Sequence, residues 1–186
     1  MRFYERRLPH FDVVGQPLFV TFRLHDSLPT HRVFPPSSLT TGKAFVEMDR
    51  LLDGASTGPR YLAIPEIAAI VADAIRYGEQ KLERISLHSY VIMPNHVHLL
   101  ITPKVPAGLW LRTLKGFTAH EANVILQRTG HPFWQSESYD HLVRSGEEFA
   151  RIQRYIENNP VKAGLVARPE DFPWSSAGAC LKQAAG

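Results

Sequence analysis

Two histidines separated by a single residue lie inside a stretch that is otherwise apolar. His96 and His98 belong to the sequence NHVHLLIT at 95–102, whose branched and apolar residues favour a β-strand. Residues i and i+2 of a strand point to the same face, so both imidazoles are expected to converge on one point. Two convergent imidazoles on a rigid strand can bind a divalent metal ion. The alternative is a pair of polar residues on an exposed strand face, and the spacing alone leaves both interpretations open.

A tyrosine and an amide one helical turn apart form the second candidate. Tyr155 and Asn159 lie in the sequence RYIENNPVKAGLV at 154–166, where we expect a helix to end. At about 100° per residue, Asn159 falls within the apolar stripe of this helix and Tyr155 on its flank, so both should face the interior. Singly, each has an ordinary interpretation: a core tyrosine, and a helix C-cap before Pro160. With the histidine pair they form a consistent set for a metal-assisted tyrosine nuclease.

Hydrophobic periodicity predicts the elements that must position these residues. The proline-rich stretch 25–41 is expected to be a loop, Gly78 to end one helix and Pro160 to end the last. Strands 83–93 and 95–102 are joined by a tight turn and should pair antiparallel, which predicts an α+β fold with the histidine strand at the centre of its sheet. The pattern predicts strands over 17–24, 83–93, 95–102 and 132–143, and helices over 43–54, 65–77, 107–128 and 146–159.

The composition is that of an ordinary globular protein. The chain of 186 residues is 44% hydrophobic, which suits a single domain with its own core. Its formal net charge of +3 is compatible with a nucleic-acid partner without requiring one. The lone cysteine excludes an internal disulfide and a cysteine-based zinc site. Because no apolar run reaches about 18 residues and the N-terminus lacks a signal-peptide core, we expect a cytoplasmic protein with no membrane partner.

The two candidate segments together resemble the signature segments of the single-tyrosine HUH transposases. MPNHVHLL at 93–100 and YIENNPVKAGLV at 155–166 are most similar to the REP-associated tyrosine transposase branch. Shorter similarities at 133–135, 139–144 and 174–176 extend the resemblance from about residue 10 to residue 177, the core of one transposase domain expected over 1–186. The resemblance implies a ferredoxin-like antiparallel sheet with helices packed on it, and cleavage of single-stranded DNA.

The same resemblance implies a role for each candidate residue. Tyr155 would be the nucleophile that forms a 5′-phosphotyrosine link, and His96 and His98 would bind Mg²⁺ or Mn²⁺. Asn159 occupies the position of the third ligand, where related transposases carry glutamine, so its side chain is shorter by one methylene. Two histidines, His120 and His141, are candidates for the group that deprotonates the tyrosine, although structural roles are the ordinary interpretation for both.

The partner implied by the resemblance is single-stranded DNA with hairpin-forming palindromic repeats, bound on the nucleoid. A homodimer that exchanges its tyrosines is also compatible with the resemblance. Exposed bases could stack on Trp110, Phe117 or Trp134. Basic residues on the predicted helix 107–128 and around the tyrosine segment are candidates for phosphate contacts: Arg112, Lys115, Arg151, Arg154 and Lys162.

Two other functions stay open at this point. HVHLL also resembles the histidine-triad nucleotide hydrolases, but Leu100 stands where those enzymes carry a third histidine. A non-catalytic descendant that only binds DNA hairpins is the second alternative. Such a protein would be expected to have lost one of the four site residues, and all four are present.

Overall fold

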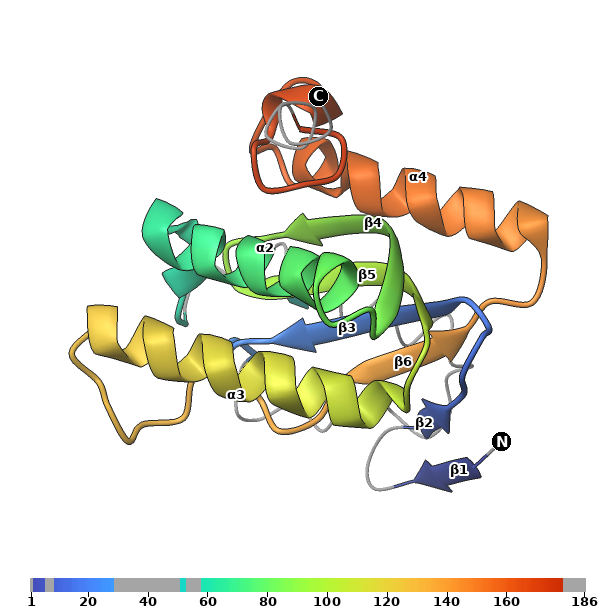
Figure 1. Ribbon diagram of the computed structural model, residues 1–186. Helices are drawn as coiled ribbons and strands as arrows, with labels where there is room; N and C mark the ends of the chain where they lie inside the picture. Colours follow the sequence, from blue (N-terminus) through green and yellow to red (C-terminus); the bar gives the residue numbers. More distant parts are fainter. Residues whose placement is uncertain (1, 6–8, 29–50, 53–57, 179–186) are drawn as a thin grey trace.

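The protein is built around a four-stranded antiparallel sheet. The structure is a computed structural model that describes residues 2–5, 9–28, 51–52 and 58–178. Figure 1 shows the elements in chain order. The strands are β1 (Arg2–Glu5), β2 (Pro9–Asp12), β3 (Leu18–Arg23), β4 (Ile85–Ile92), β5 (His96–Pro103) and β6 (Tyr139–Leu142). The helices are η1 (Tyr61–Ala63), α2 (Pro65–Gln80), α3 (Ala107–Ile125), α4 (Gly146–Lys162) and η2 (Pro169–Asp171).

The order of the strands is that of a ferredoxin-like fold. In the main sheet the order is β4-β5-β3-β6, and every neighbouring pair is antiparallel. The chain reaches this order as β3-α2-β4-β5-α3-β6, with α4 following. The predicted α+β, ferredoxin-like architecture is therefore confirmed, and so is the central position of the histidine strand. The hairpin of β1 and β2 forms a separate two-stranded sheet that the sequence analysis did not predict.

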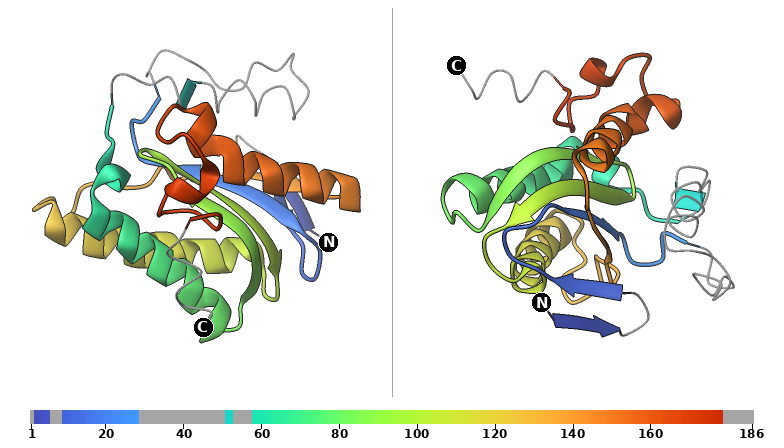
Figure 2. Two further views of the ribbon diagram at one scale, coloured as in Figure 1. Left: turned by 90° about the horizontal axis from the view of Figure 1, so that it is seen from above. Right: turned by 90° about the vertical axis from the view of Figure 1, so that its right-hand side faces the viewer.

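Helices cover both faces of the main sheet, two on one face and one on the other. Figures 1 and 2 show α2 and α3 on the same side, with α4 crossing the opposite side. Alternation along the central strands supplies both cores. On β5, Val97, Leu99 and Ile101 pack toward α2 and α3, whereas Leu100 packs toward α4. His96 and His98 share the face of Leu100, so the histidine pair points toward α4.

Glycine at position 78 does not end α2, contrary to the prediction. The helix continues to Gln80, and Gly78 lies buried where α2 crosses α3. A Cβ atom at this position would lie 2.5 Å from Nε1 of Trp110, a distance that side chains do not tolerate. The glycine is there because the indole of Trp110 occupies the space of a side chain.

Replacing Gly78 with alanine is expected to destabilise the fold by about 1–3 kcal/mol, because the added methyl group must displace Trp110. Gly116→Ala is the matched control, since Gly116 is also helical but has no atom within 4 Å of its would-be Cβ. At that position alanine should stabilise the helix by up to about 1 kcal/mol. Urea denaturation of both variants measures the difference, and equal effects would contradict the packing role of Gly78.

Proline at position 160 does not end α4 either. It lies in the last turn of a helix that runs to Lys162, where loss of one amide donor is tolerated. The chain leaves the helix at Gly164, just after the C-cap Ala163, with a φ of +71°. The amide of Leu165 donates to the carbonyl of Pro160 at 2.9 Å and so closes the last turn.

Three other predicted elements differ or cannot be compared in full. The strand predicted over 132–143 is reduced to Tyr139–Leu142, with an isolated bridge between Leu24 and Trp134 before it. The predicted loop over 25–41 and helix over 43–54 lie mostly outside the described residues, and only 25–28 and 51–52 can be compared.

In the ranges that are described, no helix is long and apolar enough to cross a membrane.

Candidate active site

The two histidines of β5 converge as predicted. Both His96 and His98 are fully buried, on the face of the sheet that α4 covers. Their Nε2 atoms lie 3.0 Å apart, and their ring centroids are 4.6 Å apart. This geometry excludes the alternative in which the pair lies on an exposed strand face.

Each imidazole is held at its other ring nitrogen. Nδ1 of His96 lies 2.7 Å from Oδ1 of Asn95, which precedes it at the start of the strand. Nδ1 of His98 lies 2.7 Å from Oγ1 of Thr21, which is directly opposite it on β3. Sequence reasoning missed both partners. The available signal for Thr21 was a polar residue inside the apolar strand LFVTFR, where it is buried.

The tyrosine of α4 lies against the histidine pair. The ring centroid of Tyr155 is 5.7 Å from that of His98 and 6.2 Å from that of Phe19, which it meets edge-on. The ammonium group of Lys162, two turns further along the helix, lies 5.4 Å from the centroid of the tyrosine ring. Tyr155 is half-buried, so it is held by the core and is still partly accessible.

The amide of Asn159 lies one turn beyond Tyr155 on the same side of α4. Asn159 is fully buried and inside the helix, which excludes the C-cap interpretation. It places an amide on the helix side that faces the sheet, where the two imidazoles already converge. The structure therefore brings the four predicted site residues to one side of the sheet.

The donor set of this site fits a divalent cation. Neighbouring ligands of an octahedral ion at about 2.1 Å are about 3 Å apart, which matches the 3.0 Å between the two Nε2 atoms. Two imidazoles and an amide oxygen suit Mg²⁺ or Mn²⁺ completed by water and phosphate. Among the side chains described at 13–28, 51–52 and 58–178, no cluster of three or more His, Cys, Asp or Glu residues offers a competing metal site. Asn159, on the helix that covers the pair, stays the predicted third ligand.

The five basic residues predicted to contact DNA lie on opposite faces of the sheet. Arg151, Arg154 and Lys162 are exposed on α4, the helix of Tyr155. Arg112 and Lys115 lie on α3, which covers the face of the sheet opposite α4. The structure thus gathers three of the five near the tyrosine, and DNA contact by any of them stays a prediction.

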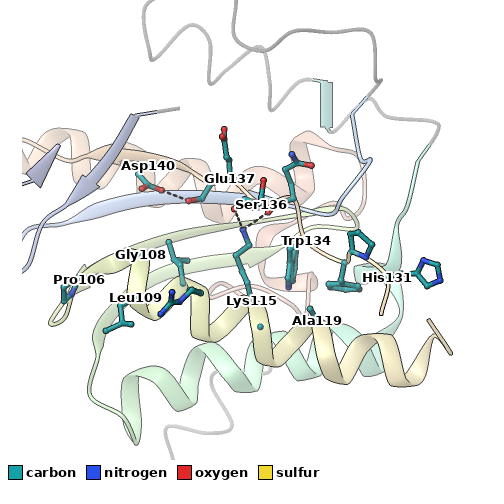
Figure 3. A pocket seen from close by; sticks show the side chains of 17 residues that line it. Pro106, Gly108, Leu109, Lys115, Ala119, His131, Trp134, Ser136, Glu137 and Asp140 are labelled. Carbon is teal, nitrogen blue, oxygen red and sulfur yellow. Dashed lines mark hydrogen bonds between the residues drawn. The ribbon is translucent and has the colours of Figure 1, made fainter. Parts of the chain in front are cut away.

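A pocket of about 780 Å³ lies between α3 and the segment 131–140, on the face away from the histidine pair. Figure 3 shows Lys115 crossing this pocket toward Ser136. Its ammonium group donates to the carbonyls of Gln135 at 2.6 Å and Ser136 at 3.0 Å. Burial lowers the pKa of Lys115 to about 8, although Asp140 and Glu137 oppose the shift. These contacts tie the segment to α3.

The lowered pKa of Lys115 predicts a specific pH dependence of stability. Between pH 8 and about 10.4, its value in unfolded chains, the unfolded state binds more protons than the folded state. The free energy of unfolding should therefore rise with pH in this window, on the order of 1–2 kcal/mol after solvent screening. Urea denaturation at several pH values should show this rise for the native chain but not for Lys115→Met.

Arg112→Met is the matched control, since Arg112 is exposed on the same helix and should leave the pH profile unchanged. A Lys115→Met variant that retains the full rise would contradict the assignment. If Lys115→Met instead weakened hairpin binding without changing the pH profile, the lysine would act on DNA as first predicted.

Of the other side chains singled out in the sequence, His141 lies on the same face of the sheet as the site, directly opposite Phe19 of β3, and the rest lie elsewhere. Trp110 and Trp134 are buried, and Trp134 donates to Thr118 at 2.9 Å, which leaves only Phe117 exposed for stacking. His120 is exposed on α3, the helix on the face of the sheet opposite α4. His141 contacts Glu148 at 2.9 Å.

Comparison with known proteins gives a consistent result. The model of the family described as "Transposase IS200 like" matches residues 66–159, slightly more than half of the chain. A REP-associated tyrosine transposase of Escherichia coli (strain K12) is 27% identical over 111 residues, which are 55% of this chain and 62% of that protein. A putative REP-associated tyrosine transposase of Haemophilus influenzae is 42% identical over 43 residues, 23% of this chain and 24% of that protein. The chain thus spans less than two thirds of either relative's length.

Among solved structures, that of a REP-associated tyrosine transposase bound to a REP hairpin has the same fold. It superposes with a TM-score of 0.62 at 19% identity, covering 95% of this chain and 82% of that one. The family match includes β4, β5, α3 and α4 as far as Asn159, so all four candidate site residues lie within it.

Proposed function

The chain belongs to the IS200-like transposase family, and from this premise we propose that it cleaves and rejoins single-stranded DNA through a 5′-phosphotyrosine intermediate. One observation carries the proposal: the ring of Tyr155 lies 5.7 Å from His98, a member of the buried histidine pair. A nucleophile and a metal site must be adjacent if both are to act on one phosphate. Because the contact is made within one chain, the proposal does not require a tyrosine from a second copy.

The chemistry follows from the residues of this site. His96, His98 and Asn159 would hold the metal. A bound Mg²⁺ or Mn²⁺ would polarise the scissile phosphate and offset its developing charge. The phenolic oxygen of Tyr155 forms a bond to phosphorus and loses its proton to solvent. The bond from phosphorus to the 3′ oxygen breaks, and that oxygen takes up a proton. Attack on the phosphotyrosine by another 3′-hydroxyl reverses the reaction and joins strands.

Three exposed cations on α4 suit a phosphate-bearing substrate, although three glutamates make the net charge of the helix zero. Arg151, Arg154 and Lys162 are exposed on this helix, and Lys162 lies next to the tyrosine ring. Cations at these positions would hold the DNA backbone and favour negative charge near the reacting phosphate. We further propose that the substrate is a hairpin-forming repeat, because the relatives are named for REP elements and one solved relative is bound to a REP hairpin.

The histidine-triad hydrolase alternative lacks its nucleophile in this fold. Leu100, at the position of the third histidine, is fully buried in the core beneath α4. No other residue of β5 replaces it, and Tyr155 would have no role in such an enzyme. A protein that only binds hairpins would not need the histidines or the tyrosine. The experiment below distinguishes this alternative from a nuclease.

The proposal is tested with single-stranded DNA that carries a palindromic hairpin and unpaired flanks, incubated with the protein and Mg²⁺ or Mn²⁺. We expect a covalent protein–DNA adduct on a denaturing gel, formed with the metal and not with EDTA. The same sequence as a fully paired duplex is the matched control and should give none. Tight hairpin binding without an adduct under any metal condition would favour a protein that only binds hairpins.

A further inference from the structure

A continuous set of hydrogen-bonding contacts runs through the two histidines and beyond them. It joins Thr21 on β3, both imidazoles, Asn95 at the start of β5 and the backbone of Leu52. The first three contacts are 2.7 Å from Thr21 Oγ1 to His98 Nδ1, 3.0 Å between the Nε2 atoms, and 2.7 Å from His96 Nδ1 to Asn95 Oδ1. In the fourth, Nδ2 of Asn95 donates to the carbonyl of Leu52 at 3.0 Å. The direction of each contact can be assigned from the chemistry of its partners.

The carbonyl of Leu52 can only accept a hydrogen bond. Asn95 must therefore turn its NH₂ group toward Leu52 and its oxygen toward His96. An amide oxygen also only accepts, so His96 carries its proton on Nδ1. The Nε2 atom of a neutral His96 is then left with its lone pair facing His98. Asn95 thus presets His96 in the tautomer that binds a metal ion.

When no metal is bound, His98 takes the opposite tautomer to His96, with its proton on Nε2. Two lone pairs facing each other at 3.0 Å would repel, so Nε2 of His98 carries the proton that lies between the rings. In the neutral ring its Nδ1 atom is then an acceptor, and the hydroxyl of Thr21 must donate to it. His98 in this state has no lone pair for a metal ion.

We propose that Thr21 and Asn95 are positioning residues of the metal site, with Asn95 fixing His96 and Thr21 allowing His98 to change its tautomer when the metal binds. The inference rests on the proposed function of the site. Nε2 of His98 gives up its proton to solvent, Nδ1 takes one from solvent, and the imidazole stays neutral. The Thr21 hydroxyl rotates from donor to acceptor, which an amide oxygen like that of Asn95 could not do.

The decisive variant is Thr21→Val, which keeps the branched shape but can neither donate nor accept. Thr21→Ser is the matched control because it keeps the hydroxyl. We expect Thr21→Val to bind Mn²⁺ about 10–100-fold more weakly in calorimetric titration of the DNA-free protein, and Thr21→Ser to bind within about twofold of the native chain. Hairpin affinity should be unchanged in both variants, which shows that each is folded. Equal Mn²⁺ affinities for the two variants and the native chain would overturn the inference.

A second measurement reads the tautomers directly. Long-range ¹⁵N NMR of the imidazoles should show His96 protonated at Nδ1 with and without saturating Mg²⁺. His98 should change from Nε2-protonated to Nδ1-protonated when Mg²⁺ is added. If His98 keeps one tautomer throughout while the protein binds metal and cleaves DNA, the inference is overturned and the proposed function is not. If the native chain binds neither Mn²⁺ nor Mg²⁺, the metal dependence of the proposed function is contradicted. The tautomer change of His98 is then contradicted as well.

Discussion

Replacing Tyr155 with phenylalanine is expected to abolish the covalent adduct with DNA while hairpin affinity stays within about twofold. The phenylalanine ring retains the edge-on contact with Phe19 and the contact with His98, so the fold and the DNA surface should be preserved. Loss of the nucleophile should lower the cleavage rate by at least about 10³-fold. The measurement is single-turnover cleavage of a labelled hairpin strand, followed on a denaturing gel.

Tyr139→Phe is the matched control for this prediction. Tyr139 lies on β6 and packs in the same core beneath α4. Burial, reinforced by Asp140 and Glu148, raises its pKa to about 12, which makes its phenol a poorer nucleophile than an ordinary tyrosine. The control should therefore cleave like the native chain. If Tyr155→Phe still formed the adduct and Tyr139→Phe did not, the nucleophile would be misassigned.

Replacing His98 with asparagine is expected to abolish both metal binding and cleavage. The amide of asparagine reaches about as far as Nδ1 of histidine, so it can keep the contact with Thr21 while the group at the Nε2 position is lost. Cleavage should fall by at least about 10³-fold, because the phosphate would lose its electrostatic stabilisation. His98→Gln, whose amide oxygen reaches toward the Nε2 position, should retain part of both activities. Mn²⁺ titration and single-turnover cleavage measure the two effects.

Two observations separate this prediction from a loss of structure. Hairpin affinity and the urea midpoint report whether His98→Asn is folded, and His120→Asn, at an exposed position on α3, should match the native chain. A folded His98→Asn variant that cleaves at the native rate would show that the imidazole is not a ligand. If both asparagine and glutamine variants failed to fold, the pair would have a structural role.

Much of the fold could be predicted because the central strands are short apolar runs bounded by turn residues. Once β3 is recognised as a strand, period 2 places Leu18, Val20 and Phe22 on one face and Phe19 and Thr21 on the other. The errors came from residues whose local preference was overridden by packing. Glycine usually favours a helix end, but Gly78 lies inside a helix because the indole of Trp110 occupies the space of a side chain. Proline usually breaks a helix interior, but Pro160 lies in the last turn, where it is tolerated.

The candidate site was predicted to the extent that its residues share one element. His96 and His98 share a strand, and Tyr155 and Asn159 share a helix, so period 2 and period 3.6 place each pair. Thr21 could not be found in this way, because it meets His98 across 77 positions of sequence through strand pairing. Nor could periodicity show that Arg112 and Lys115 lie on the face of the sheet opposite α4, since a sequence pattern does not say which face a helix covers.

The most direct test of the central claim is to locate the covalent bond. The native chain is incubated with the hairpin strand and Mn²⁺, the adduct is digested with protease and nuclease, and the modified peptide is sequenced by mass spectrometry. We expect one modified residue, Tyr155, carrying the phosphate from the 5′ end of the cleaved DNA. A bond to any other residue, or cleavage with no covalent protein–DNA species at all, would contradict a tyrosine nuclease built on this site.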